Sequence, residues 1–352
     1  MYRREFIQRA AAGALAFSMP KLPAFLKEVP MGVVVHSYAS RWNSKTPSDK
    51  YPGFTNAIEL IEHCRSIGAG GVQTVVKDWS ADFAKKVRDE REKTGLYLEG
   101  SIAVPKQAGQ VAAFEQEVIN AKEAGATVLR TVCSTGRRYE TYHSPDEWQT
   151  LKKTALTSLQ LAEPVLRKHK VRLAVENHKD WRAEELVAIL KQLNSEWIGV
   201  TLDFGNNIAL LEDPMKLVET LAPYTFTTHV KDMGVQEYAD GFLLSEVPLG
   251  YGILDLPKMV AVCKKHNPAV TFNLEMITRD PLEIPCRKAE YWSTFDGIPK
   301  SDMDRTLRMV KQRAYKAGLP RFSQLPAEDR LAAEEKNIVS CLSYSSNRLG
   351  LK

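Results

Sequence analysis

The chain has 352 residues, 44% of them hydrophobic and 26% charged, an ordinary globular composition with enough apolar residues for a sizeable core. The formal net charge is +5, but +3 of it lies before residue 26, so the remainder is close to neutral. This near-neutral balance argues against nucleic acid or a charged membrane surface as the partner.

The first 25 residues differ in character from the rest. Arg3 and Arg4 precede Phe6 and Ile7, and a short, weakly apolar stretch then runs over residues 10–19. This pattern resembles a twin-arginine export signal, and the stretch is much shorter than the ~20 apolar residues of a membrane span. We therefore expect residues 1–25 to be a signal peptide, and the protein to be periplasmic or otherwise exported, without a membrane span.

Downstream, segments typical of strands alternate with segments typical of helices. The predicted strands are apolar and rich in β-branched residues, and they cover 31–36, 72–76, 96–104, 127–132, 171–176, 198–203, 224–229 and 269–275. The predicted helices cover 54–67, 80–95, 111–121, 144–170, 182–193, a short segment from 213, 256–266 and 300–317. The alternation predicts one (β/α)₈ TIM barrel of the α/β class over residues 31–319.

Two connections are too long for ordinary loops, residues 231–252 and 276–299. Long structured loops are usually functional, so we expect both to form walls or lids at the mouth of the barrel. Residues 320–352 form a C-terminal tail, and the sequence leaves open whether it wraps the barrel or contacts a neighbouring copy.

Four of the later strands end in a metal-ligating residue. These residues are Glu176, Asp203, His229 and Glu275, with gaps of 27, 26 and 46 residues. The carboxyl ends of barrel strands converge on one face, so the four side chains are expected to meet around one cation. Three carboxylates and one imidazole suit Mn²⁺, Mg²⁺ or a similar divalent ion better than a thiolate-binding metal.

Four short motifs contain these residues: AVENH (174–178), TLDFGN (201–206), THVKD (228–232) and NLE (273–275). Together they resemble the sugar isomerase/epimerase family with the xylose-isomerase-like barrel, over residues 31–317. The resemblance implies that Glu176, Asp203, His229 and Glu275 bind one divalent ion. Mn²⁺ is the expected ion, with Mg²⁺, Co²⁺ or Zn²⁺ as alternatives. It also implies that Glu176 and Glu275 form the acid/base pair.

The chemistry of such a site is consistent with this assignment. Removing a proton next to a carbonyl creates an enediolate, whose charge a divalent cation stabilises. Two carboxylates acting on opposite faces would give epimerisation, whereas one base moving a proton along one face would give isomerisation. The sequence leaves both outcomes open.

Two departures from the family pattern point away from a simple ketose epimerase. Asn206 stands where those enzymes usually carry a substrate-binding histidine, and no arginine follows Lys231 and Asp232 shortly afterwards. These differences suit an oxidised or unusual sugar, and with it a lyase or hydratase reaction on keto-sugars such as 3-keto-glycosides.

Further residues are candidates for the substrate site. Glu99 and Arg130 lie inside strands, where a charge must be paired, so they are expected to bind each other or the sugar. Trp79 and Trp292 are expected, with Arg279, to form a sugar-facing wall. The predicted substrate-binding residues are His36, His178, Asn206, Lys231 and Arg279.

The leading hypothesis is therefore a metal-dependent sugar isomerase or epimerase that acts on a small sugar or oxidised sugar. The alternatives are a lyase or hydratase that uses the same metal site, and a sugar-binding protein without catalysis. A related metal-dependent endonuclease is disfavoured, because its metal cluster is rich in histidine and it needs a basic groove. The sequence leaves a homo-oligomeric assembly open.

Overall fold

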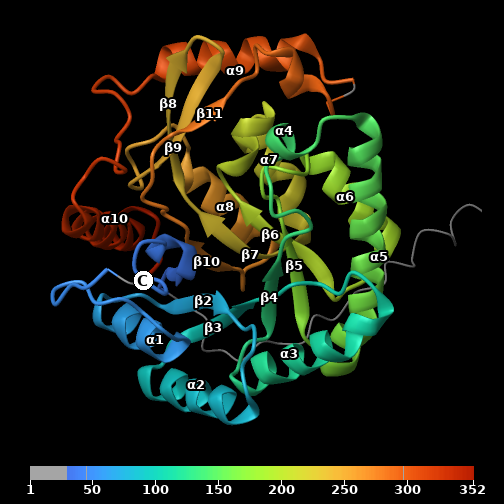
Figure 1. Cartoon of the computed structure of the whole chain (residues 1–352), viewed down its shortest axis with the longest axis vertical. Coiled ribbons are helices and arrows are strands. Elements are labelled where there is room, and N and C mark those ends of the chain that lie inside the picture. Colours follow the sequence, from blue (N-terminus) through green and yellow to red (C-terminus); the bar gives the residue numbers. More distant parts are fainter. Residues whose placement is uncertain (1–29, 45, 296) are drawn as a thin grey trace, which may run out of the picture.

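The computed structural model describes residues 30–352 except for residues 45 and 296 (Figure 1). Within this part of the chain, eight parallel strands close into a barrel with helices on its outside. The barrel strands are β1 (Gly32–Val34), β2 (Gly71–Val75), β3 (Tyr97–Ser101), β4 (Val128–Thr131), β5 (Arg172–Glu176), β6 (Ile198–Asp203), β7 (Thr225–Val230) and β10 (Thr271–Leu274). The predicted TIM barrel is thus confirmed, and the export signal predicted over residues 1–25 lies outside the described residues.

Local signals in the sequence explain where the outer helices begin and end. The long helix α5 starts after Ser144, whose hydroxyl accepts a hydrogen bond from the backbone N–H of Glu147, and Pro145 is its first residue. None of the helices in the described chain combines the length and the apolar character that crossing a bilayer requires. The helices are α1 (Ala57–Ser66), α2 (Ala81–Thr94), α3 (Val111–Glu123), α4 (Arg138–Thr141), α5 (Pro145–His169), α6 (Ala183–Leu193), α7 (Pro214–Leu221), α8 (Leu256–His266), α9 (Lys300–Arg313) and α10 (Ala327–Arg348).

The order of the strands puts the four predicted ligands on consecutive neighbours. Strands β5, β6, β7 and β10 lie side by side in the barrel, all parallel. Asp203 lies opposite His229 in register, and Glu176 lies opposite Thr201, two residues before Asp203. Because the carboxyl ends of these strands meet at one end of the barrel, the four side chains emerge together.

The two long connections build one small sheet outside the barrel. Strands β8 (Asp232–Tyr238) and β9 (Gly241–Val247) form an antiparallel hairpin, and β11 (Leu282–Ile284) pairs with β9. The carboxylate of Asp232 accepts hydrogen bonds from three backbone N–H groups of the loop that follows β9. Both connections are therefore ordered structure, as expected of a wall.

The predicted eighth barrel helix, residues 300–317, occupies a different place. Helix α9 packs on the small sheet, and its Val310 is buried in the same cluster as Val235 and Phe242. Helix α10 packs instead on the barrel, where Ile338 and Cys341 join the main core. The prediction of residues 300–317 as a barrel helix was wrong, because an apolar stripe does not reveal which sheet covers it.

Helix α10 is also tied to the segment that follows β1. The carboxylate of Glu334, a buried residue, accepts a hydrogen bond of 2.7 Å from the backbone N–H of Ser40. Glu335 pairs with the buried Arg41 at 2.6 Å. The C-terminal tail therefore wraps the barrel, one of the two arrangements that the sequence left open.

Candidate metal centre and substrate cavity

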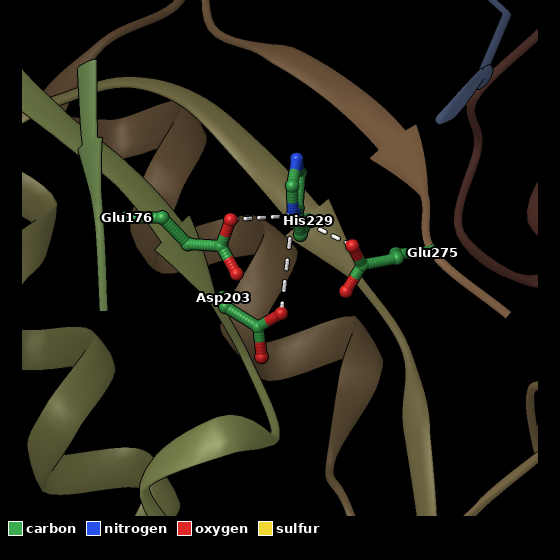
Figure 2. Close-up of side chains that lie close together, drawn as sticks. All are labelled: Glu176, Asp203, His229 and Glu275. Carbon is green, nitrogen blue, oxygen red and sulfur yellow. Dashed lines mark ion pairs between the residues drawn. The ribbon is translucent and has the colours of Figure 1, made fainter. Parts of the chain in front are cut away.

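Four side chains from neighbouring strands meet at the end of the barrel, as predicted (Figure 2). Glu176 ends β5, Asp203 ends β6, His229 lies in β7 and Glu275 follows β10. Each offers one ligand atom, and these atoms all lie within 4.8 Å of one another. Nδ1 of His229 is 3.5 Å from Glu176 Oε2, 3.9 Å from Asp203 Oδ2 and 3.5 Å from Glu275 Oε1.

A buried chain of hydrogen bonds orients the imidazole of His229. Its Nε2 lies 2.7 Å from Oε1 of Gln73, and the amide nitrogen of Gln73 donates to Glu99 at 2.9 Å. Because Gln73 presents its oxygen, Nε2 carries the proton and Nδ1 presents a lone pair to the three carboxylates. This is the tautomer that binds a metal ion through Nδ1.

The donor set fits a divalent cation. Within the described residues, Nδ1 of His229 and Oδ2 of Asp203 are buried without a hydrogen-bond partner. Three carboxylates crowded around a lone pair repel one another unless positive charge lies between them. Burial raises the pKa of Asp203, although Lys231, whose Nζ lies 2.8 Å from Oδ2 but out of line for a hydrogen bond, opposes the rise.

Glu176 is the most enclosed of the three carboxylates. Its Oε2 accepts a hydrogen bond of 2.6 Å from Nε of Arg130, and its Oε1 accepts one of 3.1 Å from the amide of Asn206. Burial by itself would raise the pKa of Glu176, but the guanidinium of Arg130 holds it well below its usual range. Arg130 therefore pairs with Glu176 and not with Glu99, whose carboxylate accepts a hydrogen bond from Gln73.

Glu275 belongs both to the cluster and to the surface of the cavity. One oxygen lies 3.3 Å from Nδ1 of His36, and the other accepts a hydrogen bond from Lys231. Burial opposes ionisation, but the ammonium of Lys231 holds the pKa of Glu275 well below its usual range. The carboxylate is therefore charged at neutral pH. His36 lies just after β1, in the 3₁₀ turn Val35–Tyr38, rather than at a strand end.

The cavity beside Glu275 has a volume of about 670 Å³, ample for a sugar. Three of the five predicted substrate-binding residues line it: His36, His178 and Arg279. The aromatic residue on its wall is Trp42, whereas the expected Trp79 and Trp292 are not among the lining residues. The lining residues are Val35, His36, Ala39, Trp42, Thr135, Gly136, Arg137, Glu140, His178, Lys179, Glu275, Ile277, Thr278 and Arg279.

The other two predicted substrate-binding residues, Asn206 and Lys231, lie behind this wall. Both are buried, and Nζ of Lys231 lies 3.3 Å from Oδ1 of Asn206. Burial would lower the pKa of Lys231, but Asp203 and Glu275 raise it, so the side chain is an ammonium. Their direct contact with substrate stays a prediction, while their contact with the ligand cluster is part of the fold.

Two residues of this site escaped the sequence analysis. Gln73 is a polar residue inside the apolar run VQTVV, and that position was the signal that could have revealed it. Lys179 lies on the cavity wall, three residues after Glu176, and only 3% of it is exposed. Burial and the nearby Lys231 lower the pKa of Lys179 to about 8. No local pattern marked this lysine.

The small sheet supports the cavity wall through Glu246, a buried residue of β9. Its carboxylate binds the guanidinium of Arg279 through two hydrogen bonds, of 2.6 and 3.1 Å. Burial would raise the pKa of Glu246, but Arg279, Lys231 and Lys179 lower it to about 2. The inserted strands thus hold Arg279, a residue of the cavity wall, through a buried carboxylate.

Comparison with known proteins agrees with this architecture. Residues 61–294 match the family model described as xylose isomerase-like TIM barrel. A 3-oxo-isoapionate decarboxylase of Pectobacterium atrosepticum is 24% identical over 272 residues, covering 75% of this chain and 92% of the relative.

Solved structures show the same fold. A xylose isomerase-like TIM barrel protein of Mycobacterium smegmatis, in complex with magnesium, has a TM-score of 0.53 and 15% identity, over 81% of this chain and 98% of that one. D-psicose 3-epimerase, solved in the presence of D-fructose, has a TM-score of 0.54 and 14% identity, over 80% and 97% of the two chains.

Proposed function

Because the chain belongs to the xylose isomerase-like TIM barrel family, we propose that it is a divalent-metal-dependent enzyme that isomerises or epimerises a sugar-derived hydroxy ketone. Mn²⁺ is the proposed ion, held by Glu176, Asp203, His229 and Glu275. Bound there, the ion would stabilise negative charge that develops on adjacent substrate oxygens.

One observation carries the proposal: Glu275 is at once a member of the buried ligand cluster and part of the cavity wall. A sugar in the cavity therefore lies against both the cluster and a charged carboxylate. Glu275 is the proposed base, which takes a proton from the carbon next to the substrate carbonyl. Lys231, hydrogen-bonded to the same carboxylate, holds it in place.

Glu176 is the proposed partner acid for epimerisation, which needs proton transfer on both faces of the carbon. Its two oxygens accept hydrogen bonds from Arg130 and Asn206. Of the two proposed acid/base residues, Glu275 lines the cavity and Glu176 does not. This arrangement favours proton transfer on one face, and with it isomerisation, over the two-faced alternative. His36 and His178 are proposed to contact the sugar from the cavity wall.

A lyase reaction is the second candidate. It is favoured by the similarity to the 3-oxo-isoapionate decarboxylase, because the matched region covers 92% of that relative. Elimination or hydration of a keto-sugar such as a 3-keto-glycoside would use the same base and the same cation. The remaining alternative, a sugar-binding protein without catalysis, predicts no proton exchange at all.

Deuterium exchange tests the proposal. The Mn²⁺-loaded protein, incubated with ketoses and 3-keto-glycosides in deuterated water, should incorporate deuterium at a sugar carbon, observed by NMR. Glu275→Gln should abolish the incorporation, whereas Glu283→Gln, at an exposed position of β11, should leave it unchanged. Full exchange by the Glu275 variant would show that this carboxylate is not the base.

Export by the leader is a further part of the proposal. The pair Arg3-Arg4, followed by Phe6-Ile7, supports a twin-arginine signal and a periplasmic or exported enzyme. This route carries folded proteins, so the enzyme would cross the membrane with its barrel formed.

A further inference from the structure

The cavity wall carries three strong cations, and two of them already have a carboxylate partner. Arg137 binds Glu140 at 2.6 Å, and Arg279 binds Glu246 at 2.6 Å. Lys179 differs, since no carboxylate among the described residues lies within 4.0 Å of its ammonium group. Its Nζ donates a hydrogen bond to Oδ1 of Asn206, which is a neutral acceptor. Lys179 is therefore a residue of the cavity wall whose positive charge has no carboxylate partner within that distance.

Such a group is costly to bury. Only 3% of Lys179 is exposed, and a buried ammonium is stable only when it is paired or when it loses its proton. The nearby Lys231 adds repulsion, and together with burial it lowers the pKa of Lys179 to about 8. An anion that enters the cavity and reaches the ammonium would therefore supply the carboxylate partner that the fold does not.

The surrounding structure also fixes the position of this residue. Lys179 has a φ of +56°, a left-handed conformation that is unfavourable for a residue with a side chain. Asp180 holds the turn by accepting hydrogen bonds from the backbone N–H groups of His178 and Trp181, at 2.9 and 2.8 Å. The carbonyl of Lys179 accepts a third from the backbone N–H of Arg138. Strain of this kind persists where the fold requires it and is concentrated at functional sites.

We propose that Lys179 binds a carboxylate of the substrate, so that the substrate class is a keto-sugar acid rather than a neutral sugar. The inference rests on the proposed function, because it names the substrate of the same cavity. A single uncompensated cation matches a single negative charge. A phosphate dianion would leave excess negative charge beside Glu275, which lines the same cavity. Asn206 connects the two parts of the site, since it accepts from Lys179 and donates to Glu176.

A matched pair of probes tests this assignment. 2-Keto-D-gluconate and D-fructose share the ketone and differ in that carbon 1 is a carboxylate in the first and an alcohol in the second. Calorimetry should show that the wild-type protein binds the acid about 10- to 100-fold more tightly, the range expected for a buried charge-assisted hydrogen bond. Lys179→Met should remove most of this preference, and Lys179→Arg should retain part of it. Lys77→Met, at an exposed position, should leave the preference unchanged.

Each titration is run with Mn²⁺ and again after EDTA treatment. A preference for the acid that persists without metal and disappears in Lys179→Met supports the carboxylate site, even if the exchange assay fails and the proposed function is wrong. Equal binding of the two probes by the wild type, or an unchanged preference in a folded Lys179→Met, would overturn the assignment. Inorganic phosphate that competes more strongly than acetate would also overturn it, since the site would then be built for phosphate.

Discussion

Gln73 accepts a hydrogen bond of 2.7 Å from Nε2 of His229, across the interior of the barrel from β2 to β7. The amide nitrogen of Gln73 is engaged by Glu99, so the amide cannot rotate without losing that contact. The imidazole is thereby held with its Nδ1 lone pair toward Glu176, Asp203 and Glu275. Two strands that contribute no residue to the cluster, β2 and β3, thus determine how His229 is presented.

Removing this amide should weaken metal binding without unfolding the protein. Gln73→Leu leaves Nε2 of His229 without its acceptor, and loss of such a partner typically costs about 10- to 100-fold in metal affinity. Titration of Mn²⁺ by calorimetry measures the change, with circular dichroism as the check on folding. An unaltered affinity would mean that Gln73 has no part in orienting the imidazole.

Metal binding should stabilise the fold. A ligand present at about 100 times its dissociation constant contributes roughly 2.7 kcal/mol, so Mn²⁺ should raise the melting temperature by a few degrees relative to the EDTA-treated protein. Asp203→Asn, which keeps the shape of the side chain and removes its charge, should eliminate most of the rise. The same rise in that variant would place the bound ion elsewhere.

Arg130 should contribute most to the free energy of unfolding when no metal is bound. Arg130→Met leaves the buried carboxylate of Glu176 without its cation, and breaking a buried pair costs about 3–5 kcal/mol. Mn²⁺ should restore part of this loss, because the ion then balances the same carboxylate. Urea unfolding with and without metal measures both effects. An equal loss of stability with and without Mn²⁺ would show that Glu176 does not bind the ion.

The C-terminal helix should make stability depend on pH. Burial raises the pKa of Glu334 to about 7, well above that of an unfolded glutamate. Between about pH 4.5 and 7 the folded state holds the proton that the unfolded state has lost, so this stabilising contribution is full below pH 4.5, declines over that range and is lost once pH has risen past 7.

The rise from 4.5 to about 7 corresponds to a loss of about 3 kcal/mol, since one pKa unit is 1.36 kcal/mol. Glu334→Gln, a neutral side chain of the same shape, should lose less stability over that range. The comparison is the difference between the two unfolding free energies at pH 5 and pH 8. Parallel pH profiles would contradict the assigned pKa.

The leader can be tested in cells. Replacing Arg3 and Arg4 by lysine should keep the full-length precursor in the cytoplasm, because the twin-arginine pair is the address that the export machinery reads. Fractionation followed by immunoblotting distinguishes the two compartments. Normal export of the double variant would assign the leader to another route.

The sequence determined the barrel and which four residues, Glu176, Asp203, His229 and Glu275, come together at its end, because both depend on local patterns. Apolar runs that end in Glu176, Asp203 and His229 mark buried strands, and parallel strands necessarily present their carboxyl ends at one face. The motifs that carry these residues also determined the family.

Only the tertiary structure decided which groups surround those ligands. Gln73 on β2 reaches His229 on β7 across the barrel, and Lys179, unlike Arg137 and Arg279, has no carboxylate within 4.0 Å among the described residues. The roles of α9 and α10 are likewise set by which sheet each apolar stripe covers. Contacts between segments distant in the chain depend on how the strands close, and no local spacing records that closure.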